Sequence, residues 1–337
     1  MVFFKYGLFF TIRSGYFFIR MAEYVSIYFI ISDMIKDQKT RIIIIRLIWI
    51  ITLFICSVGL YQYHISGLPS ITSTLSESHV YLGTFLMFTF FILAGYIFVT
   101  KNVLEKIALL LTLPLMIYIL FLSALRTGIL SIIVGIIVFF VFSRKPIGWM
   151  VAVVLAIILI LFGFEFLQNL QEYELGSAGF RNLERDLSTM GRFYIWYGTI
   201  VMLKQNPTIL ITGVGLSAFG LAVERYTPLF PGSGGAHNNY LHHLTETGMF
   251  GLAIFLYILF IFLRTSLKRS REPAQKDRAL YYGYFCGLAA LVFSGMSQET
   301  FSVQNAHGNF LGYFFIVTSL VFSKPKNFYD ETENEIS

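Results

Sequence analysis

The sequence predicts an all-α integral membrane protein, and composition, segment length and charge distribution each support this fold class. Of the 337 residues, 56% are hydrophobic and 13% are charged, and the mean hydropathy is +0.70. A soluble domain usually carries about 25% charged residues. Because so few charges cannot cover a surface that faces water, the composition excludes a soluble globular fold.

Apolar runs long enough to cross a bilayer, about 20 residues each, recur along the chain. Residues 1–14 are too short for a span of their own and are expected at the membrane interface. The remaining runs predict about nine transmembrane helices, over residues 15–35, 42–62, 80–99, 107–123, 128–142, 147–166, 241–263, 279–297 and 308–322.

The distribution of Lys and Arg predicts the orientation. The loops at 63–79 and 298–307 contain neither residue. The loops on the other side contain 16 Lys and Arg residues in total and should therefore face the cytoplasm. These loops are 36–46, 101–106, 143–146, 264–278 and 324–326. This bias accounts for the net charge of +6, so we expect membrane lipids and no nucleic acid among the partners.

The predicted helices fall into two groups, residues 1–166 and 241–323, separated by a long external segment at 167–240. Residues 324–337 form an acidic cytoplasmic tail. The external segment includes an amphipathic stretch at 193–197, so it is expected to be partly helical. Loops of this length are uncommon unless they are functional, and we therefore expect the catalytic site in this segment.

The densest polar cluster, residues 236–248, lies where the external segment meets the seventh predicted span. His237 suits general base catalysis because the ordinary pKa of histidine is near neutrality; the alternative is a loop histidine bonded to backbone. His242 and Glu246 are four residues apart and share a helix face. A zinc site needs three or four ligands with recognisable spacing, so we expect no metal and favour a polar cluster with Glu246 bonded inside the bundle.

Two arginines are candidate anion-binding residues, because guanidinium groups pair with phosphate oxygens through two hydrogen bonds. Arg126 lies in a short external turn at 123–128, where the alternative is an interaction with lipid headgroups. Arg192 follows Gly191 and is expected to open an aromatic helix whose free N–H groups favour phosphate. Arg181 and Arg185 share this segment with acidic residues, with which they could pair.

Glycines at 213, 215 and 220 resemble a nucleotide-binding loop only superficially. Such a loop requires a strand, a tight turn and a helix within a βαβ unit, which an external segment of a membrane protein does not supply. We therefore interpret them as a turn or a close approach of two backbones.

The sequence resembles the O-antigen ligase and O-antigen polymerase family of bacterial membrane glycosyltransferases, over roughly residues 20–320. Three groups of residues carry the resemblance: 123–128; Gly191, Arg192 and Trp196 with 213–215 and Phe219; and 237–241 with Glu246, Gly248 and Gly251. The last group is the most specific.

The resemblance implies a donor glycan on undecaprenyl diphosphate and transfer at the outer face of the cytoplasmic membrane, inverting, without a cofactor or an obligatory metal. His237 would deprotonate the acceptor hydroxyl, while Arg126 and Arg192 would hold the diphosphate. The substrate-binding candidates are Asn238, Tyr240, Glu246, Arg181 and Arg185.

Two alternatives stay open within and beyond this family. A ligase uses lipid A–core or another outer acceptor, whereas a polymerase of O-antigen, capsule or exopolysaccharide extends a second lipid-linked repeat. A transporter or flippase for lipid-linked sugars would share the helices and the cationic external surface. Transporters place ionisable residues near the bilayer midplane, whereas here they gather on one external side, which favours an enzyme.

Overall fold

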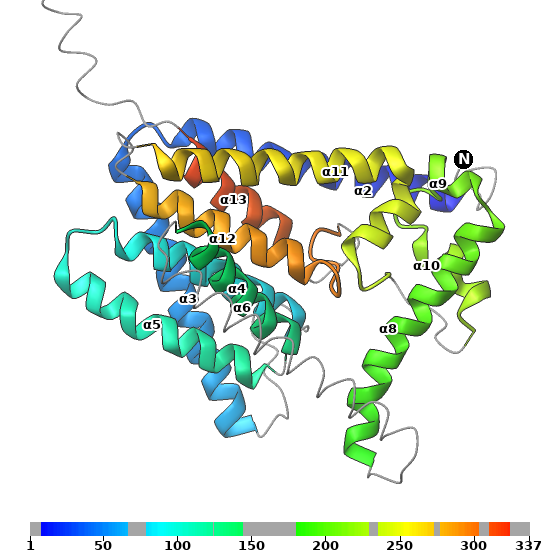
Figure 1. Cartoon of the computed structure of the whole chain (residues 1–337), viewed down its shortest axis with the longest axis horizontal. Coiled ribbons are helices and arrows are strands. Elements are labelled where there is room, and N and C mark those ends of the chain that lie inside the picture. The colour runs from blue at the N-terminus through cyan, green and yellow to red at the C-terminus, as the bar shows by residue number, and fades with distance from the viewer. Residues whose placement is uncertain are drawn as a thin grey trace, which may run out of the picture. The chain divides into compact units, whose positions relative to one another are not determined.

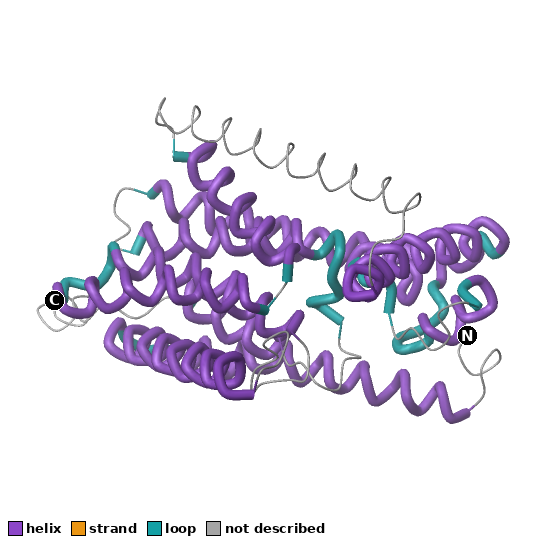
Figure 2. Tube along the Cα trace, turned by 90° about the horizontal axis from the view of Figure 1, so that it is seen from below, coloured by secondary structure: helices purple, strands orange, loops and turns teal. Residues whose placement is uncertain are grey.

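The computed structural model describes residues 8–66, 79–123, 125–143, 180–228, 235–272, 277–302 and 310–323. Every element in these ranges is a helix (Figures 1 and 2), which confirms the all-α prediction for this part of the chain. The helices are α2 (Leu8–Met34), α3 (Gln38–Ser66), α4 (His79–Ile97), α5 (Val103–Leu122), α6 (Arg126–Phe142), α8 (Phe180–Gln205), α9 (Thr208–Thr212), α10 (Phe219–Val223), the 3₁₀ helix η1 (Glu224–Tyr226), α11 (Asn239–Arg271), α12 (Arg278–Ser294) and α13 (Phe310–Phe322).

In the described part of the chain, four helices are long and apolar enough to cross a membrane, over Gln38–Ile65, Val80–Ile97, Val103–Leu122 and Asn239–Arg271. The apolar helices α6 and α13 are shorter. Helices occupy most of eight of the nine predicted ranges, but the number nine is not confirmed, and the range 147–166 lies outside the described residues. Residues 8–14 are part of the first long helix, because α2 begins at Leu8, and their place at the membrane interface stays a prediction.

The chain divides into two compact units. Unit 1 consists of Met1–Phe18, Arg126–Leu267 and Phe285–Gln304; unit 2 consists of Ile19–Leu125, Lys268–Tyr284 and Asn305–Ser337. Helices α2, α11 and α12 supply residues to both units.

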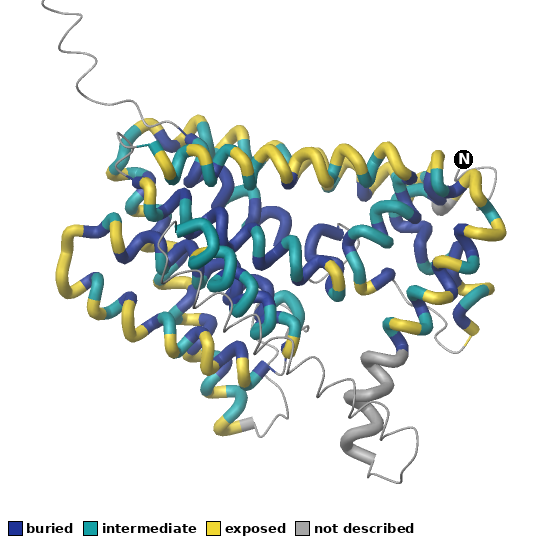
Figure 3. The backbone as a smooth tube through the Cα atoms, viewed as in Figure 1, coloured by how far each residue is buried: buried dark blue, intermediate teal, exposed yellow. Residues whose placement is uncertain are grey.

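Unit 2 is built around α4, of which 78% of the apolar span is buried, compared with 33% for α3 and for α5 (Figure 3). Phe88 of α4 packs edge-to-face against Tyr284 and Phe310. The outer faces of α3 and α5 expose large apolar side chains such as Phe54 and Leu104. A contiguous apolar surface of this kind is unfavourable in water and suits contact with lipid.

Arg41 of α3, one of the basic residues in a predicted cytoplasmic loop, is fully buried in unit 2. Its guanidinium donates to the Asp277 carboxylate at 2.5 Å and to the Leu320 carbonyl at 2.7 Å. The Ser323 carbonyl accepts a further bond at 3.1 Å. Carbonyls near the C-terminal end of α13 thus receive charged donors, an arrangement that stabilises the end of a helix.

In unit 1, two glycines allow the backbones of α9 and α11 to meet. Gly213 ends α9 with φ +66°, and a Cβ there would overlap the Glu246 carbonyl. Gly248 has φ +69°, and a Cβ there would overlap the Ile211 carbonyl. Val214 donates its N–H to the Thr245 carbonyl at 2.8 Å. The predicted close approach of two backbones at 213–215 is therefore confirmed.

Gly248 also breaks α11, because its φ and ψ of 69° and −174° are not helical. The break separates a polar first part, residues 239–247, from the apolar part that follows, where Met249, Phe250 and Tyr257 are exposed. Figure 3 shows this second part as a long row of exposed positions. The predicted span 241–263 therefore combines two segments, one polar and one apolar, that have different surroundings.

We expect Gly213→Ala to destabilise the protein by about 2 kcal/mol or more, because the methyl group would both clash and force a strained φ. The matched control is Gly15→Ala in α2, where no atom lies within 4 Å of the added Cβ. Removing a helical glycine there should stabilise by about 0.5–1 kcal/mol. Thermal unfolding of the detergent-solubilised variants measures both effects, and equal melting temperatures would contradict the close approach.

Candidate functional site

Helix α8 carries Arg192 in unit 1. The helix begins at Phe180, so the expectation that Arg192 opens it is wrong, and the argument from free N–H groups does not apply to this residue. The buried Gly191 lies within the helix and does not start it. Arg181 and Arg185 lie in the first part of α8, and their side chains are outside the described residues.

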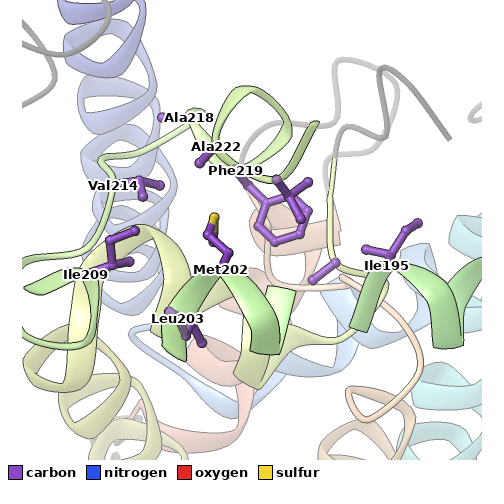
Figure 4. Close-up of a cluster of buried hydrophobic side chains, with 10 residues drawn as sticks. Ile195, Met202, Leu203, Ile209, Val214, Ala218, Phe219 and Ala222 are labelled. Carbon is purple, nitrogen blue, oxygen red and sulfur yellow. The ribbon is translucent and has the colours of Figure 1, made fainter. Parts of the chain in front are cut away.

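A buried apolar cluster holds α8 in place within unit 1 (Figure 4). Side chains from α8, α9, α10 and the connecting segments form it, namely Ile195, Met202, Leu203, Ile209, Val214, Ala218, Phe219, Ala222, Val223 and Ala236. Phe193, Tyr197 and Ile200 lie on the exposed face of the same helix. This amphipathic pattern fixes the rotation of α8, so that the partly buried Arg192 lies at the border between the two faces.

Trp196 connects α8 directly to the segment that carries His237. Its indole N–H donates to the Ala236 carbonyl at 2.7 Å. Trp196 follows Arg192 by four residues, so both side chains lie on the same side of the helix. The hydrogen bond therefore places Arg192 close to the residue that follows Ala236, which is His237.

His237 has an unusual backbone conformation, with φ +48°. Non-glycine residues adopt this left-handed region rarely, at a cost of about 1–3 kcal/mol, and such residues concentrate at functional sites. The backbone N–H of His237 donates to the carboxylate of Glu299. The side chain of His237 is classed as exposed, so the imidazole is accessible while its backbone is held.

Asn238 caps helix α11. Its side-chain oxygen accepts from the N–H groups of Tyr240 and Leu241, each at 3.0 Å. Its side-chain nitrogen donates to the Met296 carbonyl at 2.9 Å. The substrate-binding role assigned to Asn238 stays a prediction, and both polar ends of this side chain have partners within the protein.

The next two residues of the motif hold the segment after α12. Asn239 is 2% exposed; its side chain donates to Thr300 Oγ1 at 3.0 Å and accepts from the Phe301 N–H at 3.2 Å. The Tyr240 hydroxyl donates to the Val292 carbonyl. The Asn-Asn-Tyr sequence thus fixes residues 292–301 against the start of α11, and Glu299 lies within this fixed segment.

Glu299 is the residue that the sequence analysis missed. It is 9% exposed, and a Cβ at Gly235 would overlap its carboxylate, so the glycine lets the chain pass directly over it. A signal was present in the sequence: Glu299 is the one charged residue in the external loop predicted at 298–307. Its partners are more than 50 residues away in the chain, and spacing does not reveal them.

The surroundings lower the pKa of two candidate residues, His237 and Arg192. Although His237 keeps accessible surface, the protein atoms around it desolvate the ring and lower its pKa below the ordinary value. The charge of Arg192 lowers this pKa further, and Glu299 opposes the shift. Desolvation also lowers the pKa of Arg192, again opposed by Glu299. The two side chains and Glu299 are therefore electrostatic neighbours.

His242 and Glu246 lie beneath this group and are 2% and 4% exposed. His242 Nε2 is 3.4 Å from Glu246 Oε2, and His242 Nδ1 is 3.8 Å from Glu299 Oε2. The other Glu246 oxygen accepts from the Phe219 N–H at 3.2 Å. These contacts agree with the interpretation of this region as a polar cluster in which Glu246 is bonded inside the protein. Within the described residues, no group of three His, Cys, Asp or Glu side chains is arranged to hold a metal ion.

Arg126 is exposed at the start of α6, directly after the turn that follows α5, where the sequence placed it. The next residue, Thr127, accepts a hydrogen bond from Gln298 at 3.2 Å. Gln298 precedes Glu299, so the start of α6 is tied to the segment that holds His237. One short segment, residues 298–299, is thus bonded to the residue after Arg126 and to the backbone of His237, and Glu299 also acts electrostatically on Arg192.

The chain is similar to a known protein family over part of its length. No curated protein matches the chain. A protein-family model described as O-antigen ligase matches residues 111–256. The matched region includes Arg126, Arg192, His237 and Glu246 but ends before Glu299. With the apolar helices, this match supports a multi-pass membrane protein of the glycosyltransferase type. The similarity of this chain to the O-antigen ligase family thus extends over residues 111–256 and supports a relationship to that family.

Proposed function

We propose that this protein transfers a glycan from undecaprenyl diphosphate to an acceptor hydroxyl at the outer face of the cytoplasmic membrane, as an O-antigen ligase does. The observation that carries the proposal is the placement of His237 beside Arg192. An accessible imidazole whose environment favours the neutral form thus lies near a cation suited to a diphosphate.

The proposed reaction forms one bond and breaks one bond at the anomeric carbon. The acceptor oxygen attacks from the face opposite the diphosphate, so the configuration inverts. The hydroxyl proton moves to His237, and the electron pair of the broken carbon–oxygen bond leaves with the diphosphate. A base is needed on one side of the sugar and positive charge on the other.

His237 suits the role of the base for two reasons. Its lowered pKa keeps the imidazole neutral, and therefore able to accept a proton, over a wider pH range. Its left-handed backbone and the bond to Glu299 fix the direction of the side chain. Positioning of this kind reduces the entropy lost in reaching the transition state.

The two arginines suit different parts of the diphosphate interaction. Arg192 lies near His237 and is partly buried, so its charge acts strongly at the reacting centre. Arg126 lies at the start of α6, where the free N–H groups of the first turn also favour an anion. Of the two arginines, Arg126 is therefore the one that lies at a helix N-terminus. We propose that it holds the diphosphate of the donor.

The same catalytic group serves a polymerase equally well, since only the acceptor differs. Analysis of the product distinguishes the two: transfer to a lipid A–core or other outer acceptor indicates a ligase, and extension of a second lipid-linked repeat indicates a polymerase. Tyr240, Glu246, Arg181 and Arg185 stay predicted substrate-binding residues. The Tyr240 hydroxyl and the Glu246 carboxylate have partners within the protein.

If His237 is the base, His237→Ala should lower kcat by about 10²–10⁴-fold. The rate of the unaltered protein should rise with pH as His237 loses its proton, with a midpoint below about 6.5, the ordinary histidine value. Steady-state transfer with a defined lipid-linked donor measures both quantities. His64→Ala, at the exposed end of α3, is the matched control. Equal losses in the two variants would remove His237 from the site.

The arginines should differ in kinetics. Arg192→Ala should mainly lower kcat, because Arg192 acts on charge that develops at the reacting centre. Arg126→Ala should mainly raise the donor KM, because Arg126 binds the donor before reaction. Lysine at either position should restore activity only in part, since it loses the paired hydrogen bonds. Arg225→Ala, exposed in η1, is the control, and unaltered kinetics in both alanine variants would exclude the arginines.

The external location of α8 can be tested with a thiol reagent that does not cross membranes. Both native cysteines, Cys56 and Cys286, are buried and should not react. Tyr197→Cys, on the exposed face of α8, should be labelled in intact cells. Arg271→Cys, exposed at the end of α11, should be labelled only after permeabilisation. The reverse pattern would overturn the topology and, with it, catalysis at the outer face.

A further inference from the structure

We propose that Glu299 is a positioning residue for His237, holding its backbone through one carboxylate oxygen and keeping a negative charge next to the base. The proposal rests on the function proposed above, because it assumes that His237 is the base. Glu299 lies outside the region that matches the O-antigen ligase family model, residues 111–256. The contacts that support the proposal all lie within unit 1.

The first step is the bond between Glu299 Oε1 and the His237 backbone N–H. His237 is one of two non-glycine residues with positive φ in the described part of the chain. A conformation of this cost persists only when surrounding contacts determine it. Trp196 fixes the preceding carbonyl and Asn238 caps the following helix, so Glu299 supplies the contact at His237 itself.

The second step is the rigidity of Glu299. The residues on either side of it, Gln298 and Thr300, are bonded to Thr127 and Asn239. Gly235 leaves no space between its Cα and the carboxylate. Because the backbone is anchored on both sides and the head group is covered, the carboxylate stays directed at His237.

The third step is the second carboxylate oxygen, which lies 3.8 Å from His242 Nδ1. Beyond His242 lies Glu246, at 3.4 Å from Nε2. Two buried carboxylates thus flank one imidazole, which, when protonated, balances one of their charges. This row, Glu246–His242–Glu299, allows a buried negative charge to persist near His237, where an unpaired one would be costly.

The fourth step is the effect on His237. The charged and titratable groups that act on its imidazole are Glu299 from the segment after α12, Arg192 from α8 and His242 from α11. Arg192 and His242 favour the neutral imidazole, and Glu299 favours the protonated form. Glu299 therefore keeps His237 basic enough to take a proton from a hydroxyl, despite desolvation and the neighbouring cation.

Glu299→Gln separates this role from a structural one, because the amide oxygen still accepts from the His237 N–H while the charge is lost. The acidic limb of the pH profile of kcat/KM should move to lower pH by about one unit. Glu299→Asp keeps the charge but shortens the side chain, so kcat should fall about tenfold while the limb moves less. Glu224→Gln, exposed in η1, is the charge-matched control and should change neither.

A measurement independent of activity completes the test. In detergent-solubilised protein with ¹³C-labelled histidine, the His237 signal is assigned by its loss in His237→Asn and titrated by NMR. A lower His237 pKa in Glu299→Gln supports the proposal, and it does so even if no transfer activity is found, in which case only the proposed function fails. An unchanged His237 titration overturns the proposal, including when activity is lost. Should Glu299→Gln fail to fold, Glu299→Ser removes the same charge, and a His237 titration in Glu299→Ser that matches the one in Glu224→Gln would overturn the proposal as well.

Discussion

The contact between the Glu299 carboxylate and the His237 backbone N–H is the interaction on which the arrangement of unit 1 depends. It joins the segment after α12 to the turn before α11, and both are then bonded further, to α6 through Thr127 and to α8 through Trp196. Four helices from distant parts of the sequence are thereby brought to one histidine. Since a buried carboxylate is costly without partners, the surrounding bonds and the contact itself support each other.

The local chemistry of the site could be predicted from the sequence, but its contacts could not. The polar run at 236–248 stood out because histidine and glutamate are rare at a membrane boundary. Glu299 did not, because a single acid in a loop gives no periodic signal, and Asn238 and Asn239 were assigned no structural role. Their actual role, to hold residues 292–301, depends on a tertiary contact that spacing along the chain does not encode.

Two errors in the sequence analysis have a common cause, namely a backbone angle that hydropathy does not detect. The sequence predicts that a helix begins directly after Gly191, whereas α8 passes through this residue. Gly248 was placed inside a continuous span, although its positive φ breaks α11. Glycine is compatible with both outcomes. The two glycines differ in their packing: Gly191 is buried within α8, whereas Gly248 has non-helical φ and ψ and lies so close to the Ile211 carbonyl that no Cβ fits there.

The two units use buried charge in different ways, and this difference separates stability from chemistry. In unit 2, Arg41 pairs with Asp277, and Arg46 pairs with Glu105 through two hydrogen bonds of 2.8 and 2.9 Å. These are closed pairs, in which each charge is neutralised by its partner. In unit 1, the row of Glu246, His242 and Glu299 is bonded to the backbone of His237, whose imidazole is accessible, and Glu299 acts electrostatically on that imidazole and on Arg192. A row that ends at an accessible proton acceptor can respond to a substrate, whereas a closed pair cannot, so the catalytic group is expected in unit 1.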